Sequence, residues 1–305
     1  VGQLDHVQYA DNSVVAFDYD DSGNLTNVNV PGDVDHGFGY DSLNRNDVVT
    51  TPLSGNYTYQ YDADGRIISV VTPSGRSVVM PFTGGNKALL SGTLALQGTT
   101  TWTAGTLYIQ TAGLLTNSGL LAIQSDNEIR NDFNGPVGTL TNTATGTVRK
   151  SVTTGTTTIG LSCCSSTVVF NNAGLVDVQT GTLSLIGGGT STGSFTVAGG
   201  TTLQFGGGTH ALQAGSSVSG AGLVSVTGGT VNVAGTYTPS STGITGGTAN
   251  FNSAASTTTL TLSGGTLAGS GTLTVTDGTW TAGTLNGTGT TTVTGPLSLS
   301  GGGNK

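Results

Sequence analysis

Residues 229–233 read Gly-Thr-Val-Asn-Val, and this short pattern decides the fold expected for most of the chain. It returns as Gly-Thr-Leu-Ser-Leu at residues 181–185 and as Gly-Thr-Leu-Thr-Val at residues 271–275. Apolar and polar residues alternate with a period of two, which is typical of a strand with one buried face. Glycine in front of each run favours a turn, because it adopts positive φ without steric cost. We therefore expect short strands separated by glycine turns from residue 88 onward.

The spacing of these glycine turns indicates a solenoid. Recurrent glycines stand at positions 181, 200, 215, 229, 247, 265 and 283, so 102 residues divide into six intervals with a mean of 17. A repeat this short holds two or three small strands, as in one coil of a β-helix, whereas a propeller blade needs roughly 40 residues. At ~17 residues per coil, ~220 residues would form about 13 coils and a rod of roughly 60 Å. The fold class expected for residues 85–305 is a parallel β-helix solenoid.

Composition excludes several classes of partner. Charged residues make up 8% of the 305 residues, against the quarter or so that is typical of globular proteins. Residues 1–82 hold eleven acidic and three basic residues, and residues 83–305 hold five of each. Without a basic stripe, neither nucleic acid nor an anionic bilayer is a plausible electrostatic partner. The sequence contains no run of roughly 18 apolar residues, so it predicts no segment that inserts into a membrane.

A different repeat occupies residues 1–84. Three Tyr-Asp pairs stand 21 residues apart: Tyr19 and Asp20, Tyr40 and Asp41, and Tyr61 and Asp62. In each copy an aromatic residue two positions before the tyrosine shares its strand face, and the aspartate opens a polar turn. This pattern predicts three β-hairpins in an N-terminal module, with tyrosines that pack and aspartates that cap turns. Calcium held by Asp18, Asp20 and Asp21, or by Asp62 and Asp64, is the alternative.

The N-terminal pattern resembles the YD repeats of bacterial Rhs and teneurin-like proteins. The third copy, residues 59–67, follows the family motif closely through Gly65 and Arg66. The second copy departs from it, because Asn44 stands where the family has glycine. The resemblance implies a β-structured array within a large secreted or surface protein. In that family long YD arrays form a shell around a toxin, and four or so strand pairs are too few to enclose such a cargo. The resemblance therefore does not imply toxin activity.

The solenoid region contains a longer repeat. Residues 102–107, Trp-Thr-Ala-Gly-Thr-Leu, return unchanged at residues 280–285, so Trp102 and Trp280 serve as repeat anchors. Gly-Asn-Lys at residues 85–87 likewise returns at residues 303–305, and we expect a longer tandem array. These segments resemble the glycine-rich β-strand repeats of very large bacterial surface and autotransporter-associated proteins. That resemblance implies a right-handed parallel β-helix and secretion.

Catalytic chemistry finds little support in the sequence. A polysaccharide-active β-helix needs convergent carboxylates. After residue 132 the acidic residues are Asp177 and Asp277, about six coils apart. The polar run at residues 126–132 is expected to be a solvated surface loop, and Asp126, Glu128 and Asp132 are weak candidates for a cation site. We expect no cofactor other than, at most, calcium.

The adjacent cysteines Cys163 and Cys164 point to opposite faces if the chain is extended there. A disulfide between them has poor geometry, so two unpaired thiols are expected. A strained vicinal bridge or a link between molecules are the alternatives.

These observations lead to a hypothesis about function. We expect a non-enzymatic structural or adhesive solenoid of a secreted bacterial surface, matrix or filament protein, located outside the cell or on its surface. Self-association is the expected interaction, with copies stacking head to tail through exposed strand edges. The first alternative is binding of ice or of a glycan surface by threonine-rich faces. A polysaccharide-active enzyme is a third and disfavoured hypothesis.

Overall fold

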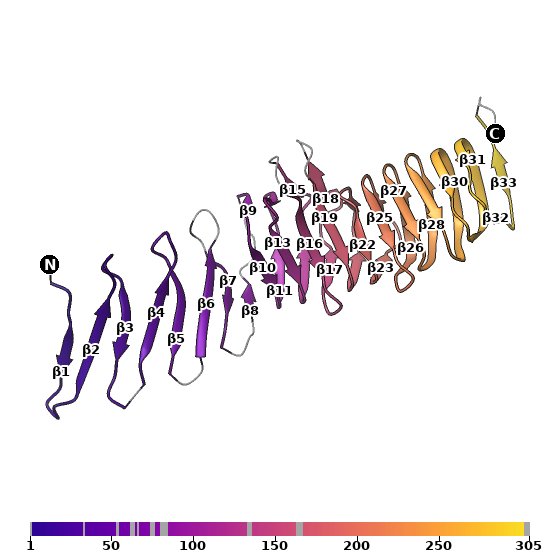
Figure 1. Ribbon diagram of the computed structural model, residues 1–305. Coiled ribbons are helices and arrows are strands. Elements are labelled where there is room, and N and C mark those ends of the chain that lie inside the picture. Colours follow the sequence, from indigo (N-terminus) through magenta and orange to yellow (C-terminus); the bar gives the residue numbers. More distant parts are fainter. Residues whose placement is uncertain are drawn as a thin grey trace. The chain divides into compact units, whose positions relative to one another are not determined.

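The computed structural model describes residues 2–32, 34–52, 55–61, 65, 67–73, 77–79, 85–132, 136–162 and 167–301. Within these residues the chain is all-β, with 33 strands and no helix, and hence no helix that is long and apolar enough to cross a membrane. The chain divides into two compact units, Val1–Met80 and Pro81–Lys305. Figure 1 shows the strands of each unit, which we describe separately. The sequence places the boundary close by, after residue 84.

The first unit is one antiparallel sheet in which neighbouring strands are consecutive in the chain. Its strands are β1 (His6–Gln8), β2 (Val14–Tyr19), β3 (Leu25–Asn29), β4 (His36–Tyr40), β5 (Asn46–Thr51), β6 (Gly55–Tyr61), β7 (Ile67–Val71) and β8 (Ser77–Val79). Each expected hairpin is present, as β2–β3, β4–β5 and β6–β7. No residue with described burial in this unit is fully buried, so the sheet is a single layer.

A β-bulge recurs in each of these hairpins. The strand register shifts directly before Tyr19, Tyr40 and Tyr61. A bulge bends its strand and increases the local twist. The repetition at 21 residues therefore places the same bend in each of these three hairpins.

The second unit is a parallel β-solenoid built from three columns of strands. Column 1 contains β10 (Thr93–Leu96), β13 (Leu114–Asn117), β16 (Gly138–Asn142), β19 (Val168–Asn172), β22 (Gly189–Ser191), β25 (Thr209–Leu212), β27 (Thr230–Val233) and β29 (Thr248–Phe251). Column 2 contains β11 (Thr99–Trp102), β14 (Leu120–Ile123), β17 (Thr147–Lys150), β20 (Leu175–Val178), β23 (Ser194–Val197) and β32 (Thr290–Val293). Column 3 contains β9 (Lys87–Leu89), β12 (Leu107–Ile109), β15 (Glu128–Asn131), β18 (Thr156–Ser162), β21 (Thr182–Leu185), β24 (Thr202–Phe205) and β33 (Leu297–Leu299).

Four long strands run through more than one column. β26 (Ser217–Val226) and β28 (Thr236–Ile244) contribute to columns 2 and 3. β30 (Ala255–Ala268) and β31 (Thr272–Leu285) contribute to all three. Within β26, β30 and β31 the chain turns corners at glycines with positive φ, namely Gly220, Gly265 and Gly283.

The core consists of inward-facing residues stacked in register from coil to coil. One such stack in column 3 is Ile159, Leu185, Phe205, Val226, Ile244, Leu262, Trp280 and Leu299. From Ile159 to Leu262 these side chains are buried. The alternation seen in the sequence therefore separates core from surface, as a strand with one buried face requires.

The corner before column 1 explains why glycine recurs in front of the strands of this column. Gly247 has a φ of 62°, and a Cβ atom placed there would lie 2.5 Å from the carbonyl oxygen of Gly229 in the previous coil. Only glycine meets both the conformation and the close approach. In the last coils, each recurrent Gly-Thr pair therefore places its glycine at the corner and its threonine at the first position of column 1.

The predicted fold class is confirmed, but the predicted count of about 13 coils is wrong. The solenoid has about 10 turns. Register shows why: Thr230 pairs with Thr248 and Thr248 with Thr266, an interval of 18, whereas Leu114 pairs with Thr139, an interval of 25. The glycines used to count belong to different columns, and earlier coils are longer than the mean of 17.

Candidate functional site

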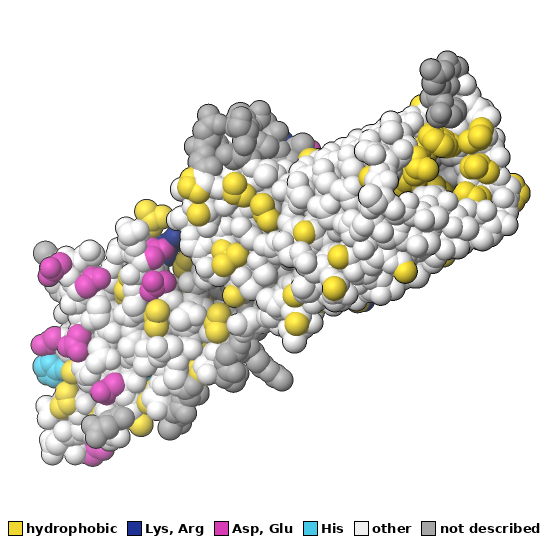
Figure 2. Space-filling view, turned by 45° about the vertical axis from the view of Figure 1, so that its right-hand side comes forward, with side chains coloured by type: hydrophobic (Ala, Val, Ile, Leu, Met, Phe, Trp, Pro, Cys, Tyr) yellow, Lys and Arg dark blue, Asp and Glu magenta, His cyan; other side chains and the backbone are white. Residues whose placement is uncertain are grey.

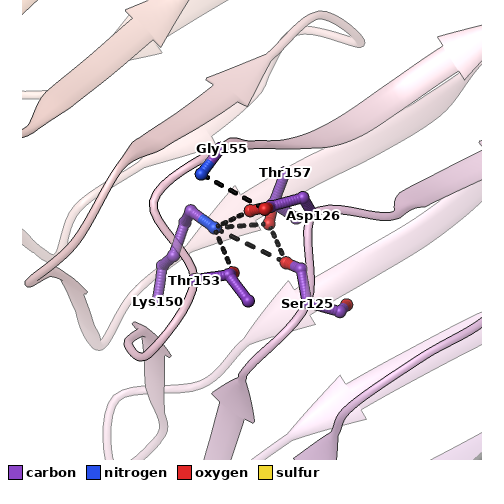
Figure 3. Close-up of polar contacts among 6 residues, drawn as sticks. All are labelled: Ser125, Asp126, Lys150, Thr153, Gly155 and Thr157. Atoms are coloured by element: carbon purple, nitrogen blue, oxygen red, sulfur yellow. Dashed lines mark hydrogen bonds and ion pairs between the residues drawn. The ribbon is translucent and has the colours of Figure 1, made fainter.

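A dense set of polar contacts in the described part of the solenoid surrounds Lys150 (Figure 3). Lys150 lies in column 2 between Ile123 and Val178, at a position where its neighbours in the stack are apolar. Its side chain is fully buried. Burying an unpaired ammonium in such surroundings is very unfavourable, so its partners decide whether this coil is stable.

Four oxygen atoms surround the Lys150 ammonium. It donates to Asp126 Oδ1 at 2.8 Å, to Thr157 Oγ1 at 3.0 Å and to Thr153 Oγ1 at 3.2 Å, with the carbonyl oxygen of Ser125 at 3.5 Å. Thr157 in turn donates its hydroxyl proton to the carbonyl oxygen of Ser125 at 2.5 Å. An ammonium has three protons and no acceptor, so these contacts use its full hydrogen-bonding capacity.

Asp126 joins this cluster to the next turn of the chain. Its Oδ2 accepts a hydrogen bond from the Gly155 backbone N–H at 3.2 Å. The hydrogen bond from Lys150 holds the pKa of Asp126 below its usual range, despite partial burial that acts to raise it. The carboxylate is therefore ionised at neutral pH and serves as the counter-charge of a buried lysine.

Glu128 and Asp132 are both bonded to one arginine. Arg130 Nη1 lies 2.8 Å from Glu128 Oε2, and Arg130 Nε lies 2.5 Å from Asp132 Oδ1. Residues 126–132 therefore do not form the simple surface loop expected from the sequence. Glu128–Asn131 is strand β15, paired with β12 and β18, because Ile129 and Asn131 point inward and the charged residues point outward.

The three weak cation candidates are thus divided between two cationic partners. Asp126 faces Lys150, whereas Glu128 and Asp132 face Arg130. Among the described residues no three His, Cys, Asp or Glu side chains are grouped as metal ligands would be.

A second ion pair links neighbouring coils on the outer surface. Arg149 Nε lies 2.9 Å from Asp177 Oδ2, and Thr196 Oγ1 donates to Asp177 Oδ1 at 3.1 Å. These three residues occupy one register position on β17, β20 and β23. The contact holds successive coils together.

In the first unit, the repeat aspartates cap the hairpin turns. Asp20 Oδ1 accepts hydrogen bonds from the backbone N–H groups of Ser22 and Asn24, at 2.9 and 2.8 Å. Asp41 Oδ1 does the same for Leu43 and Arg45, at 2.9 and 3.0 Å. Such local bonds from an aspartate side chain favour tight turns.

The side chain four residues after each aspartate completes the turn. The Asn24 amide donates to Asp20 Oδ2 at 2.9 Å, and Arg45 Nη2 lies 2.7 Å from Asp41 Oδ2. These hydrogen bonds lower the pKa of both aspartates. Asn44, which departs from the family motif, has a φ of 65°, a conformation that asparagine tolerates better than most residues.

The repeat tyrosines connect each hairpin to the segment that precedes it. The hydroxyl of Tyr19 donates to Leu4 O at 3.0 Å, that of Tyr40 to Leu25 O at 3.0 Å, and that of Tyr61 to Asn46 O at 2.5 Å. Each acceptor lies 15 residues before its tyrosine. The same bond is therefore copied along the sheet.

The remaining sequence anchors lie in different settings. Asp62 and Arg66 lie outside the described residues, as do Cys163 and Cys164, whereas Gly65 has a φ of 79°. The guanidinium of Arg45 lies 4.6 Å from the centre of the Tyr61 ring, which is cation–π geometry.

The two tryptophans make the same local hydrogen bond but are buried to different degrees. Trp102 donates its indole N–H to Gly105 O at 2.8 Å, and Trp280 to Gly283 O at 3.3 Å. Trp102 is buried and Trp280 is half-buried.

Threonines form one continuous column on the outside of the solenoid. Thr209, Thr230, Thr248, Thr266 and Thr284 pair in register on five successive coils. All five are exposed or half-exposed. Successive strands lie about 4.8 Å apart, so the column presents regularly spaced methyl and hydroxyl groups.

The structure also reveals a buried asparagine ladder that the sequence analysis missed. Asn117 Nδ2 donates to Asn142 Oδ1, and Asn142 Nδ2 to Asn172 Oδ1, both at 2.8 Å. The three residues share one inward position in column 1. Intervals of 25 and 30 residues conceal this alignment, because loops of different length separate the strands.

Together these features define a repeat protein in which an antiparallel hairpin sheet precedes a parallel β-solenoid. Residues 1–99 match the family described as Teneurin YD-shell, which supports the identification of YD repeats in this segment. The match covers 99 of 305 residues and continues past the first unit into the first coil. This family is associated with extracellular or surface proteins. No curated protein matches the chain.

Proposed function

We propose that this protein is a non-enzymatic structural or adhesive element of a secreted bacterial surface, matrix or filament protein. The observation that carries the proposal is the uninterrupted parallel stacking of all three columns from β10 to β33. About 10 turns at about 4.8 Å each make a rod of about 48 Å. A rod whose coils share one continuous core would hold a domain attached to one end at a fixed distance from the other end.

The charged residues of the solenoid support this role. Asp126 neutralises a buried lysine, and Asp177 bonds to Arg149 on the neighbouring coil. Both carboxylates are used to hold coils together, as expected of a scaffold. The structural proposal is accordingly favoured over a polysaccharide-active enzyme, and it requires neither calcium nor another cofactor.

Two further observations support the proposed location and the proposed partner. Association of the YD-shell family with extracellular or surface proteins supports secretion to the cell surface. A solenoid end with strand edges that lack a neighbouring strand supports self-association, since such edges pair with other chains.

Removal of one complete coil tests the structural proposal. Deleting residues 230–247 places Thr248 directly after Gly229, where Thr230 stands now, and so preserves the corner and the register. The protein without this coil should fold and be about 4.8 Å shorter. Fluorescence energy transfer between click-reactive labels at Ser91 and Ser298 would measure the change, and cell-surface display would measure adhesion.

Deletion of the neighbouring coil, residues 248–265, is the matched control, because it leaves Thr266 after Gly247 in the same way. A structural role predicts the same shortening and the same adhesion for both deletions. If one deletion folds, shortens the rod and abolishes adhesion while the other does not, the structural proposal is overturned in favour of a ligand site in that coil.

The threonine column favours a second candidate function, recognition of ice or of an ordered glycan surface. Thr230, Thr248 and Thr266 repeat at the strand spacing of about 4.8 Å, so a lattice of similar spacing would meet equivalent groups on each coil. Thr248→Leu should abolish thermal hysteresis or glycan retention if this face binds. Thr238→Leu, an exposed threonine of column 2, is the control.

A further inference from the structure

Residues 151–155, which connect β17 to β18, contain a strained backbone conformation. Val152 has a φ of 85°, and the Thr153 N–H donates to the carbonyl oxygen of Ser151 at 3.2 Å. Val152 is therefore the central residue of a three-residue γ-turn of the rare, strained kind. A β-branched residue seldom adopts positive φ, because its Cβ atom crowds the neighbouring backbone. The loop thus holds a conformation that its own sequence disfavours.

Other coils place glycine where the same corner has positive φ. Between columns 2 and 3 these residues are Gly105, Gly181 and Gly200, with φ values of 78°, 58° and 79°. The coil that contains Lys150 has Val152 instead, and the valine side chain is 66% exposed. Because this side chain is largely in solvent, its burial does not stabilise the turn. Other contacts of the loop must therefore hold it closed.

Those contacts pass through one ion pair. Thr153 Oγ1 accepts a hydrogen bond from the Lys150 ammonium at 3.2 Å, and the Gly155 N–H donates to Asp126 Oδ2 at 3.2 Å. The ammonium of Lys150 lies 2.8 Å from Asp126 Oδ1. Figure 3 shows Thr153 and Gly155 bonded to the two members of this pair. The closed loop therefore depends on the opposite charges of Asp126 and Lys150.

The other charged side chains described on these coils are bonded to one another. They are Glu128 and Asp132 with Arg130, and Asp177 with Arg149. Strands β14, β18 and β21, which adjoin the same corner, contain no charged residue. Without the charge of Asp126, the Lys150 ammonium would lie between Ile123 and Val178 with no counter-charge. Such a buried charge is very unfavourable.

Acid is the condition that removes this counter-charge. The hydrogen bond from Lys150 holds the pKa of Asp126 below its ordinary value of 3.8. A carboxylate whose pKa is lowered by folding stabilises the closed loop fully above its unfolded-state pKa, and this stabilisation is lost as pH falls through the folded-state pKa. The loop should therefore stay closed at neutral pH and open only in acid below about pH 3.8.

We propose that residues 151–155 form an acid-operated latch on the solenoid. When Asp126 is protonated, the Lys150 ammonium leaves the core, the turn at Val152 relaxes and the loop opens to solvent. Figure 2 shows a face of the solenoid that carries few charged side chains. The open latch therefore adds a free cation to a surface with little charge. The latch goes beyond the proposed structural role and does not depend on it.

Amine labelling tests the latch at pH 8, where Asp126→Asn imitates the protonated carboxyl group without acid. Lys150 is fully buried, and we expect it to react with an amine-specific ester at least ~10-fold faster in this variant, as located by peptide mass spectrometry. Asp177→Asn is the matched control, because Asp177 bonds to the half-exposed Arg149. It should leave Lys150 unreactive. Protection of Lys150 in Asp126→Asn, or an equal gain in labelling at the buried Lys87, would overturn the proposal.

Hydrogen exchange tests the unmodified chain, whether or not the asparagine variant folds. Between pH 5 and pH 2.5, the amides of residues 155–158 should lose protection after correction for intrinsic exchange rates. The loss should exceed that in Lys150→Met at least ~10-fold, because methionine leaves no buried charge to release. Losses of equal size in the two proteins would overturn the proposal.

Variants of Val152 separate the strained turn from the ion pair. In the Asp126→Asn chain, Val152→Gly supplies a residue that adopts a φ of 85° without strain. It should slow the labelling of Lys150 by about threefold, since relief of strain is partly offset by the greater freedom of glycine in the open loop. Val152→Ala keeps a Cβ atom and is the matched control. Equal labelling of the two double variants would show that strain does not drive opening, and would overturn the latch.

Discussion

At the scale of single residues, Lys150 and Asp126 are unequal partners. Lys150 is fully buried, whereas the Asp126 side chain is 39% exposed. Truncation of the carboxylate leaves a buried ammonium without its counter-charge, and truncation of the lysine leaves a carboxylate that water can reach. Breaking a buried pair from the exposed side is therefore the more damaging change.

We predict that Asp126→Ala lowers the free energy of unfolding by about 3 kcal/mol, near the lower end for a broken buried pair. Lys150→Met, which restores an apolar residue between Ile123 and Val178, should change it by less than about 1 kcal/mol. Urea denaturation at pH 7 measures both. Equal losses in the two variants would contradict this account.

His210 is a second polar residue in an inward stack. It follows Gly189 and precedes Val231, and its ring centre lies 4.8 Å from that of Phe205. Its Nε2 lies 3.0 Å from Gly207 O. Burial lowers the pKa of His210 to about 4, from 6.5. The folded protein therefore keeps this imidazole neutral well below the pH at which the unfolded chain protonates it.

Stability should accordingly fall as pH decreases from about 6.5 to about 4, where the unfolded chain binds a proton that the folded chain does not. The full loss from His210 is about 3 kcal/mol and is complete below pH 4. His210→Leu should remove this part of the pH dependence. Urea midpoints of both proteins at pH 7, 5 and 4 provide the test, with carboxylate titration common to both. Parallel pH profiles would refute it.

At the scale of elements, the tyrosine hydroxyls attach each hairpin to the segment that precedes it. We predict that Tyr40→Phe destabilises the β4–β5 hairpin by about 1 kcal/mol, because Leu25 O loses its donor. Amide hydrogen exchange should accelerate in β3, β4 and β5. Tyr57→Phe is the control, as the Tyr57 hydroxyl has no hydrogen bond among the described residues. Equal exchange in both variants would show that the repeated bond contributes nothing.

The elements also show how far the sequence predicts this fold. Period-two alternation identifies the strands, and the 18-residue interval from Thr230 to Thr266 gives the true coil length of the last turns. The same alternation holds at Glu128–Asn131, but charged outward residues there resemble a loop. Loops of unequal length in the first coils hide the register, and with it the alignment of Asn117, Asn142 and Asn172.

The candidate site was predictable only in part. The Tyr-Asp spacing correctly identifies the turns capped by Asp20 and Asp41, because all their partners lie within four residues. Lys150 was missed because its partners come from other segments, up to 25 residues away. A basic residue at an inward position of an alternating strand is the signal that would have identified it.

At the scale of the whole molecule, the two units differ in how their strands are stabilised. Described side chains of Val1–Met80 are at most half-buried, whereas Pro81–Lys305 contains a continuous column of fully buried residues such as Ile159, Leu185 and Phe205. Burial of apolar area is the main favourable term in folding, at roughly 25 cal/mol per Å². A single-layer sheet gains far less from it than a closed solenoid.

We therefore predict two unfolding steps, with the hairpin sheet opening first. Native-state hydrogen exchange followed by mass spectrometry at increasing urea should show β2 to β7 losing protection while β16 to β30 stay protected. Coil deletion in residues 230–247 should affect the second step and leave the first unchanged. A single transition in which both units exchange together would mean that the sheet draws its stability from the solenoid rather than from its own repeated turns and tyrosine bonds.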